Sequence, residues 1–211
     1  MIAQDDPIIF IVDDDYRMRE ALSSFVEALG FRTASYGSGS EFLRADRPDS
    51  PACLILDLEL PDIGGLELQQ ELADRNAPPV IFVTGHGDIP SSVRAMKTGA
   101  IEFLQKPFDE HELQSAIEKA IGMDRLARQK RSELQHLNSC YKLLTHREQE
   151  VLPFVIGGLL NKETAADLGT SEVTIRVHRG QIMRKMGARS LAELVRMADK
   201  LGITPRSESV D

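Results

Sequence analysis

Residues 52–65 read ACLILDLELPDIGG, an apolar run that ends at Asp57 and continues into a turn with a glycine pair. The run Cys53–Leu56 is short and rich in apolar residues, which predicts a strand covered on both faces. Four further short runs predict strands, at Ile8–Val12, Arg32–Ser35, Val80–Thr84 and Phe103–Leu104. Amphipathic helical segments separate these runs. Residues 1–121 therefore predict an α/β domain with a doubly wound, five-stranded parallel sheet of the flavodoxin-like type.

Polar side chains stand at or just after the ends of four of these runs. They are Asp13, Asp14, Asp57, Thr84 and Lys106. Because the carboxyl ends of parallel strands meet at one edge of a sheet, we expect these groups to converge. Carboxylates held close together favour a hard cation such as Mg²⁺, and an aspartate can accept a phosphoryl group as an acyl phosphate. The pattern predicts a phosphoryl-transfer site in which Thr84 and Lys106 bind phosphoryl oxygens.

Each of these residues alone has a simpler interpretation as a turn, a helix cap or an exposed charge. Their joint position at successive strand ends favours a site. A Mg²⁺-dependent phosphohydrolase is the alternative, but such enzymes carry a second aspartate two residues after the nucleophile, where this chain has Glu59. The sequence does not determine whether the peptide bond between Lys106 and Pro107 is cis or trans, and trans is the default.

Residues 144–203 predict an all-α domain of four helices with clear start signals. Thr145 and Glu148 form one capping-box pattern, Ser190 and Glu193 a second, and Asn161 and Ser171 are typical N-caps. The expected helices are 146–156, 162–168, 172–186 and 191–201. The second and third are joined by a tight turn at the spacing of a helix-turn-helix, with 172–186 as the recognition helix.

One face of the predicted recognition helix is basic and slim, which suits the major groove of DNA. Arg176 suits a guanine edge and Val177 a thymine methyl, and nearby basic and hydroxyl groups suit phosphates. The candidate DNA-binding residues are Lys162, Thr174, Arg176, Val177, Arg179, Gly180, Arg184 and Lys185. A helical bundle with an exposed basic face, and an output that binds RNA or protein, are the alternatives.

The charge and composition of the chain agree with a two-part organisation. Residues 1–121 hold 10 basic and 22 acidic side chains, whereas residues 122–211 hold 15 and 11, so only the second part suits a polyanion. Residues 122–143 predict a charged helical linker, either a dimer seam or a spacer, and 204–211 a loose tail. Two cysteines and the lack of a long apolar run indicate a cytoplasmic protein with no membrane contact.

Residues 1–121 resemble the receiver domain of two-component response regulators. The motifs that carry the resemblance are 12–15 (VDDD), 56–65 (LDLELPDIGG), 83–87 (VTGHG) and 106–108 (KPF). The resemblance implies that Asp57 accepts a phosphoryl group from a sensor histidine kinase, without the chain being a turnover enzyme. It also implies Mg²⁺ bound by Asp13 and Asp57 directly, by Asp14 through water and by the Glu59 backbone carbonyl.

By the same resemblance Thr84 and Lys106 sense the phosphoryl oxygens, and Thr84 and Phe103 form the switch. Phe103 stands where many receivers carry a tyrosine, so its ring switches without a hydroxyl hydrogen bond. Glu59 and His86, two residues after Asp57 and Thr84, flank the site.

Residues 144–201 resemble the LuxR-type DNA-binding domain of NarL/FixJ regulators, through 144–152 (LTHREQEVL) and 172–179 (EVTIRVHR). The resemblance implies a transcription factor that forms a homodimer on phosphorylation and binds double-stranded DNA, with RNA polymerase as a candidate partner. It assigns 191–201 as a dimer helix with four residues facing the partner, Leu191, Leu194, Val195 and Ala198. Gly180 departs from relatives that carry a longer side chain there.

Overall fold

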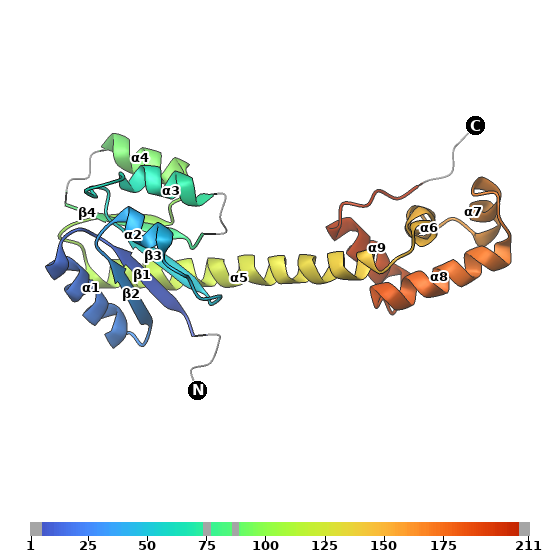
Figure 1. Ribbon diagram of the computed structural model, residues 1–211, viewed down its shortest axis with the longest axis horizontal. Helices are drawn as coiled ribbons and strands as arrows, with labels where there is room; N and C mark the ends of the chain where they lie inside the picture. The colour runs from blue at the N-terminus through green and yellow to red at the C-terminus, as the bar shows by residue number, and fades with distance from the viewer. Residues whose placement is uncertain (1–5, 74–76, 86–88, 207–211) are drawn as a thin grey trace. The chain divides into compact units, whose positions relative to one another are not determined.

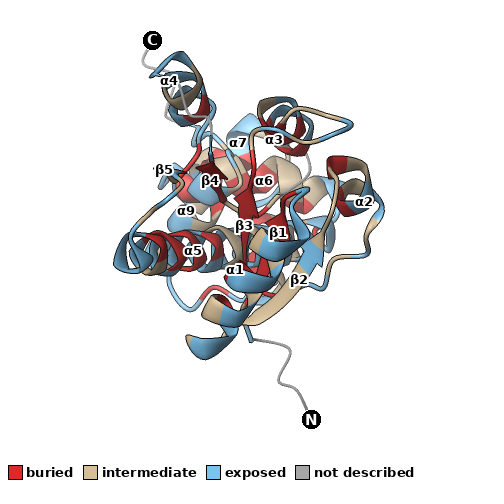
Figure 2. Cartoon of the chain, turned by 90° about the vertical axis from the view of Figure 1, so that its left-hand side faces the viewer, coloured by how far each residue is buried: buried red, intermediate tan, exposed pale blue. Residues whose placement is uncertain are grey.

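The computed structural model describes residues 6–73, 77–85 and 89–206. The chain divides into two compact units, Met1–Arg128 and Gln129–Asp211, and each is treated by itself below. Figure 1 labels the helices and the strands β1 to β4, and Figure 2 also labels β5. No helix in the described ranges is both long enough and apolar enough to cross a membrane.

The first unit contains the predicted parallel sheet. Five strands pair within its described residues, in the order β2-β1-β3-β4-β5. Their bounds are β1 (Ile8–Val12), β2 (Arg32–Tyr36), β3 (Ala52–Leu56), β4 (Val80–Thr84) and β5 (Glu102–Gln105). Every pairing is parallel. This order is the flavodoxin-like one, and it confirms the fold that was predicted from the apolar runs.

Helices cover both faces of this sheet, which explains why β1, β3 and β4 are apolar at almost every position. On one face α1 (Tyr16–Ala28) and α5 (Glu110–Lys142) pack against residues such as Ile9 and Ile55. On the other face, residues such as Phe10 and Leu54 contribute to a second core cluster. The helices α2 (Gly39–Arg44), α3 (Gly65–Ala73) and α4 (Ile89–Lys97) lie on this second side of the buried strands (Figure 2).

The second unit contains the predicted helices, α6 (His146–Ile156), α7 (Asn161–Asp167), α8 (Glu172–Met186) and α9 (Leu191–Lys200). Their starts follow the sequence signals at Thr145, Ser171 and Ser190, whose hydroxyl oxygens each accept a backbone N–H three residues on. Asn161 differs from its predicted role, because α7 begins at this residue and the backbone N–H before it is bound by the Glu163 carboxylate instead.

The helix α5 is continuous over 33 residues and includes residues 122–142 of the predicted helical linker. Within the first unit its residue Asp124 is buried. The Asp124 carboxylate accepts the backbone N–H of Ala52 at 2.9 Å and the Nε of Arg128 at 2.6 Å. Arg128 also pairs with Asp49. These contacts attach α5 to the start of β3 beyond the predicted end of the domain at residue 121.

Candidate functional site

Two buried aspartates lie side by side where the strand order of the sheet reverses. Asp13 follows β1 and Asp57 follows β3, and these two strands are neighbours with Val12 opposite Leu56. The backbone N–H of Asp57 donates to the carbonyl of Val12 at 2.9 Å. Open α/β sheets place their ligands at this reversal point, outside the carboxyl ends of the strands.

Lys106 connects the two aspartates. Its Nζ donates to Asp13 Oδ2 at 2.7 Å and to Asp57 Oδ2 at 2.9 Å. The lysine is positioned through its own backbone, since its N–H donates to the Thr84 carbonyl at 2.8 Å and the Lys106–Pro107 peptide bond is cis. Residues 93 and 49 positions apart in the sequence therefore form one cluster, as the strand-end argument predicted.

Burial and the bonds of Lys106 have opposing effects on the pKa values in this cluster. Burial raises the pKa of the Asp13 carboxyl, and the hydrogen bond and charge of Lys106 offset this only in part. Burial by itself lowers the pKa of Lys106, but its hydrogen bonds to Asp13 and Asp57 outweigh that effect, so its pKa lies above the ordinary value. One half-buried ammonium thus faces two buried carboxylates, and the cluster has an excess of negative charge.

The carboxylates can hold a divalent cation. Ligand oxygens of Asp13, Asp14 and Asp57 lie within 4.8 Å of one another. Backbone groups orient two of them, because Asp15 N–H donates to Asp13 Oδ1 at 2.9 Å and Glu59 N–H donates to Asp57 Oδ1 at 3.2 Å. Oxygen donors in this number fit Mg²⁺, which takes few protein ligands and keeps waters. The Glu59 side chain is exposed.

Arg19, which sequence reasoning did not single out, supports the acidic loop after β1. Its Nη1 donates to the backbone carbonyls of Asp13 and Asp14, at 2.8 and 3.0 Å. A positive charge is therefore held against the loop that carries two of the carboxylates. The only sequence signal is a basic residue one turn into α1, which is common on exposed helices.

The predicted switch residues lie on the neighbouring strands. Thr84, the last residue of β4, is 1% exposed, and Phe103 of β5 is half-buried and packs beside Phe82 with ring centroids 6.2 Å apart. His86 lies outside the described residues.

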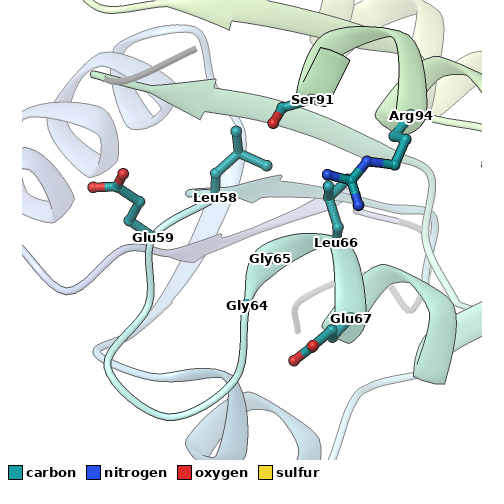
Figure 3. A pocket seen from close by; sticks show the side chains of 8 residues that line it. All are labelled: Leu58, Glu59, Gly64, Gly65, Leu66, Glu67, Ser91 and Arg94. Carbon is teal, nitrogen blue, oxygen red and sulfur yellow. The ribbon is translucent and has the colours of Figure 1, made fainter. Parts of the chain in front are cut away.

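A pocket lies beside the cluster, between the loop after β3 and helix α4. Figure 3 shows Ser91 and Arg94 of α4 reaching toward the loop, opposite Leu58 and Gly65. Of the predicted site residues, Glu59 lines this pocket, whereas Asp13, Asp57 and Lys106 are not among its lining residues. The carboxylate cluster therefore belongs to the sheet edge and not to the pocket.

In the second unit, α8 has a buried and an exposed face. Ile175, Ile182 and Met186 are buried in the core. On the opposite face Val173 is 67% and Val177 57% exposed. The exposed residues at helical spacing beside these valines are Arg176, Gly180 and Arg184. A large exposed apolar side chain flanked by arginines is suited to base edges and phosphates.

Two basic residues predicted to serve phosphates instead have partners within the unit. Lys185 Nζ donates to the buried Glu148 carboxylate at 2.6 Å, and Arg179 Nη1 donates to the Leu159 carbonyl at 3.0 Å. Both side chains are half-buried. Their sequence positions near the basic face suggested exposure, but α8 turns Lys185 toward α6. Lys162 and Arg184 are exposed, and Thr174 bonds to the Ser171 hydroxyl at the helix start.

The prediction for α9 needs a correction. Leu194 and Ala198 are 0% exposed and belong to the core of their own unit, so they do not face a partner. The apolar face of α9 is instead buried in the same core cluster as residues of α6 and α8. Leu191 is 39% exposed and Val195 is half-buried against the core.

Comparison with known proteins agrees with the two units. Residues 9–118 match the response regulator receiver domain, and residues 142–198 match the bacterial regulatory proteins of the luxR family. Nodulation protein W of Bradyrhizobium diazoefficiens is 46% identical over 198 residues, which cover 93% of this chain and 87% of that protein. Transcriptional regulatory protein FixJ of Azorhizobium caulinodans is 41% identical over 204 residues, covering 95% and 96%.

A solved structure of the response regulator StyR matches with a TM-score of 0.84 and 45% identity, covering 92% of this chain and 99% of that one. The chain therefore belongs to the response regulators of two-component systems, with a receiver domain and a LuxR-type DNA-binding domain that regulates transcription. Within that class it is a FixJ-like regulator of the NarL/FixJ type.

Proposed function

We propose that Asp57 accepts a phosphoryl group from a phosphohistidine of a sensor histidine kinase. A carboxylate oxygen of Asp57 attacks the phosphorus, the bond from phosphorus to the imidazole nitrogen breaks, and the nitrogen takes up a proton. The observation that carries this proposal is the buried cluster in which Lys106 lies 2.9 Å from Asp57 and 2.7 Å from Asp13. The chain acts as an acceptor and not as a turnover enzyme.

Asp13, Asp14 and Asp57 would hold Mg²⁺ through their carboxylates, with Asp14 acting through water and the Glu59 backbone carbonyl as a further ligand. The bound cation would supply charge that neutralises the phosphoryl oxygens. Lys106 is placed to leave its bond to Asp57 and pair with a phosphoryl oxygen, and Thr84 to donate its hydroxyl to another. Phe103, which is half-buried, then moves together with Thr84.

Phosphorylation adds about −1.5 to −2 charge at Asp57 and promotes formation of a homodimer. The face supporting this step lies on α4, where Ile89, Val93 and Met96 recur at helical spacing and are 80%, 45% and 47% exposed. Two receivers that bury these side chains bring two DNA-binding domains together. In α9, Leu191 and Val195 remain candidates for a contact between those domains.

For DNA we propose that Arg176 and Val177 read base edges while Lys162, Thr174 and Arg184 contact phosphates. Arg179 and Lys185 hold the helix-turn-helix together through Leu159 and Glu148. We place the receiver at 1–121, the linker at 122–143, the DNA-binding domain at 144–203 and the tail at 204–211. A cytoplasmic location and contact with RNA polymerase follow from the same proposal.

The test compares wild type with Asp57→Asn after treatment with acetyl phosphate and Mg²⁺. Wild type is expected to gain a phosphoryl group by intact mass, to dimerise in analytical ultracentrifugation and to bind duplex DNA more tightly. The variant is expected to remain monomeric and weak on DNA, because an amide does not form the acyl phosphate. Dimerisation of the variant at the wild-type level would overturn the proposal.

A further inference from the structure

The recognition helix α8 contains a glycine that its own fold does not require. Gly180 lies near the middle of Glu172–Met186, is exposed, and has an ordinary helical backbone. Among the described residues, and apart from its chain neighbours and the backbone of α8, no atom lies within 4 Å of where a Cβ would stand. A glycine inside a helix costs stability relative to alanine. Neither packing nor backbone conformation in the unit explains it.

The glycine lies on the face proposed to meet DNA. Arg176 and Val177 precede it by four and three residues, Arg184 follows it by four, and all of these are exposed. Neighbours at these spacings share one side of a helix. The exposed face therefore has larger side chains toward both ends and a gap at its centre.

A gap in this position has a geometric use in the major groove. The groove is about 12 Å wide, and an α-helix with its side chains is about 10–12 Å across, so the helix nearly fills it. Removing one central side chain lets the helix backbone come closer to the bases. The side chains of Arg176 and Val177 on the adjoining turn then reach base edges from a shorter distance.

We propose that Gly180 determines specificity by its missing side chain: it lets α8 seat against the base pairs of double-stranded DNA. This inference rests on the proposed DNA-binding face, and it assigns to Gly180 a steric role rather than a hydrogen bond. A side chain at this position reduces the depth of the helix in the groove. Contacts to bases are lost, while contacts to the phosphates at the rim persist.

The test uses full-length protein with beryllofluoride and Mg²⁺, and a duplex that wild type selects from a random pool. Gly180→Ala and Gly180→Gln are compared with Gly122→Ala and Gly122→Gln. Gly122 is an exposed glycine inside α5 that also has open space around its Cβ position. All four substitutions suit a helix, and all are expected to raise the unfolding temperature.

On the selected duplex, the dissociation constant is expected to rise about fivefold for Gly180→Ala and at least about fiftyfold for Gly180→Gln, the range of one or two lost base contacts. On unrelated DNA the change stays below about twofold, because phosphates dominate that binding. The Gly122 variants bind both duplexes as wild type does.

Wild-type affinity of Gly180→Gln for the selected duplex, with a folded domain, would overturn the inference. Arg176→Ala separates this failure from that of the proposed face. If Arg176→Ala loses selective binding and Gly180→Gln keeps it, the steric role is wrong and the face stands. If both keep it, the assignment of this face to DNA is wrong.

Discussion

Two lysine–carboxylate clusters among the described residues share the same chemistry but differ in charge balance. In the receiver, Lys106 lies between the carboxylates of Asp13 and Asp57, and Asp14 adds a third nearby. In the DNA-binding unit, Lys185 pairs with Glu148 at 2.6 Å. The same Glu148 also accepts the backbone N–H of Thr145 at the start of α6.

Because of this difference in charge balance, the pKa of Asp13 is shifted up and the pKa of Glu148 is shifted down. Burial raises the pKa of Asp13, and a single lysine shared with Asp57 does not reverse the effect. Burial also raises the pKa of Glu148, but the bonds from Lys185 and Thr145 outweigh it, and the pKa ends below its ordinary value. Surplus carboxylate in the receiver cluster agrees with the proposed binding of a cation and a phosphoryl group, whereas the balanced pair stabilises the fold of its own unit.

The largest effect is expected in the receiver from Lys106→Met. The ammonium stabilises charge on the phosphoryl oxygens, so the rate of phosphorylation by acetyl phosphate should fall about 100-fold. Intact mass spectrometry over time measures this rate. Lys119→Met, an exposed lysine of α5, is the control and should react as wild type does. A rate for Lys106→Met within about threefold of wild type would assign the lysine to structure alone.

In the balanced pair, Lys185→Met should destabilise the DNA-binding unit by about 3 kcal/mol, because it leaves the Glu148 carboxylate buried without its ammonium. Urea unfolding of the full chain, followed by hydrogen exchange of α6 and α8, measures the change. The double variant Glu148→Gln/Lys185→Met should recover more than half of the loss. A loss of equal size in the double variant would mean that packing of the lysine stem, not charge, is responsible.

Asp124, a further buried carboxylate, sharpens the comparison. Asp124→Asn in α5 keeps the shape but weakens the bonds to Ala52 N–H and Arg128, and should cost about 1–2 kcal/mol in receiver stability. Asp13→Asn is the matching change in the receiver cluster, where carboxylates outnumber lysines. It should lower the stability of the metal-free receiver by less than Asp124→Asn does, or should even raise it. Thermal unfolding of both variants without Mg²⁺ provides the measurement. A larger loss of stability for Asp13→Asn than for Asp124→Asn would show that the charge balance of a cluster does not govern its stability.

The smallest effect is expected from pH. Because the folded pKa of Glu148 lies below its ordinary value of 4.5, its contribution is fully present above that pH and is lost as the pH falls through the folded pKa. Glu148→Gln should therefore flatten the pH dependence of unfolding of the second unit below the ordinary value of 4.5. An unchanged slope would mean that other carboxyls carry the acid sensitivity.

The sequence predicted the receiver cluster better than the contacts of the second unit, for a physical reason. Strand ends of a parallel sheet converge whatever the side chains do, so Asp13, Asp57 and Lys106 could be placed together from the apolar runs alone. A helical stripe carries no such constraint. It identifies Leu194 and Ala198 as one face of α9 but not what covers that face, which is the core of their own unit.

The partners of long basic side chains could not be predicted from the sequence either. Lys185 and Arg179 stand near a basic face in sequence, yet they bond to Glu148 and to the Leu159 carbonyl. Such contacts depend on how helices cross, which periodicity does not give. Arg19 bonds to backbone carbonyls, and a backbone partner leaves no trace in the sequence.

The bond from Asp124 to the Ala52 N–H has a consequence for building chimaeric sensors. A receiver excised at residue 121 and fused to a foreign output domain would leave this N–H at the start of the central strand buried without its acceptor, at a cost of about 1–3 kcal/mol. Asp57, the proposed phosphoacceptor, follows the other end of that same strand. Fusions that retain the chain through Arg128 keep the strand anchored, and the transferable module is longer than its sequence motifs suggest.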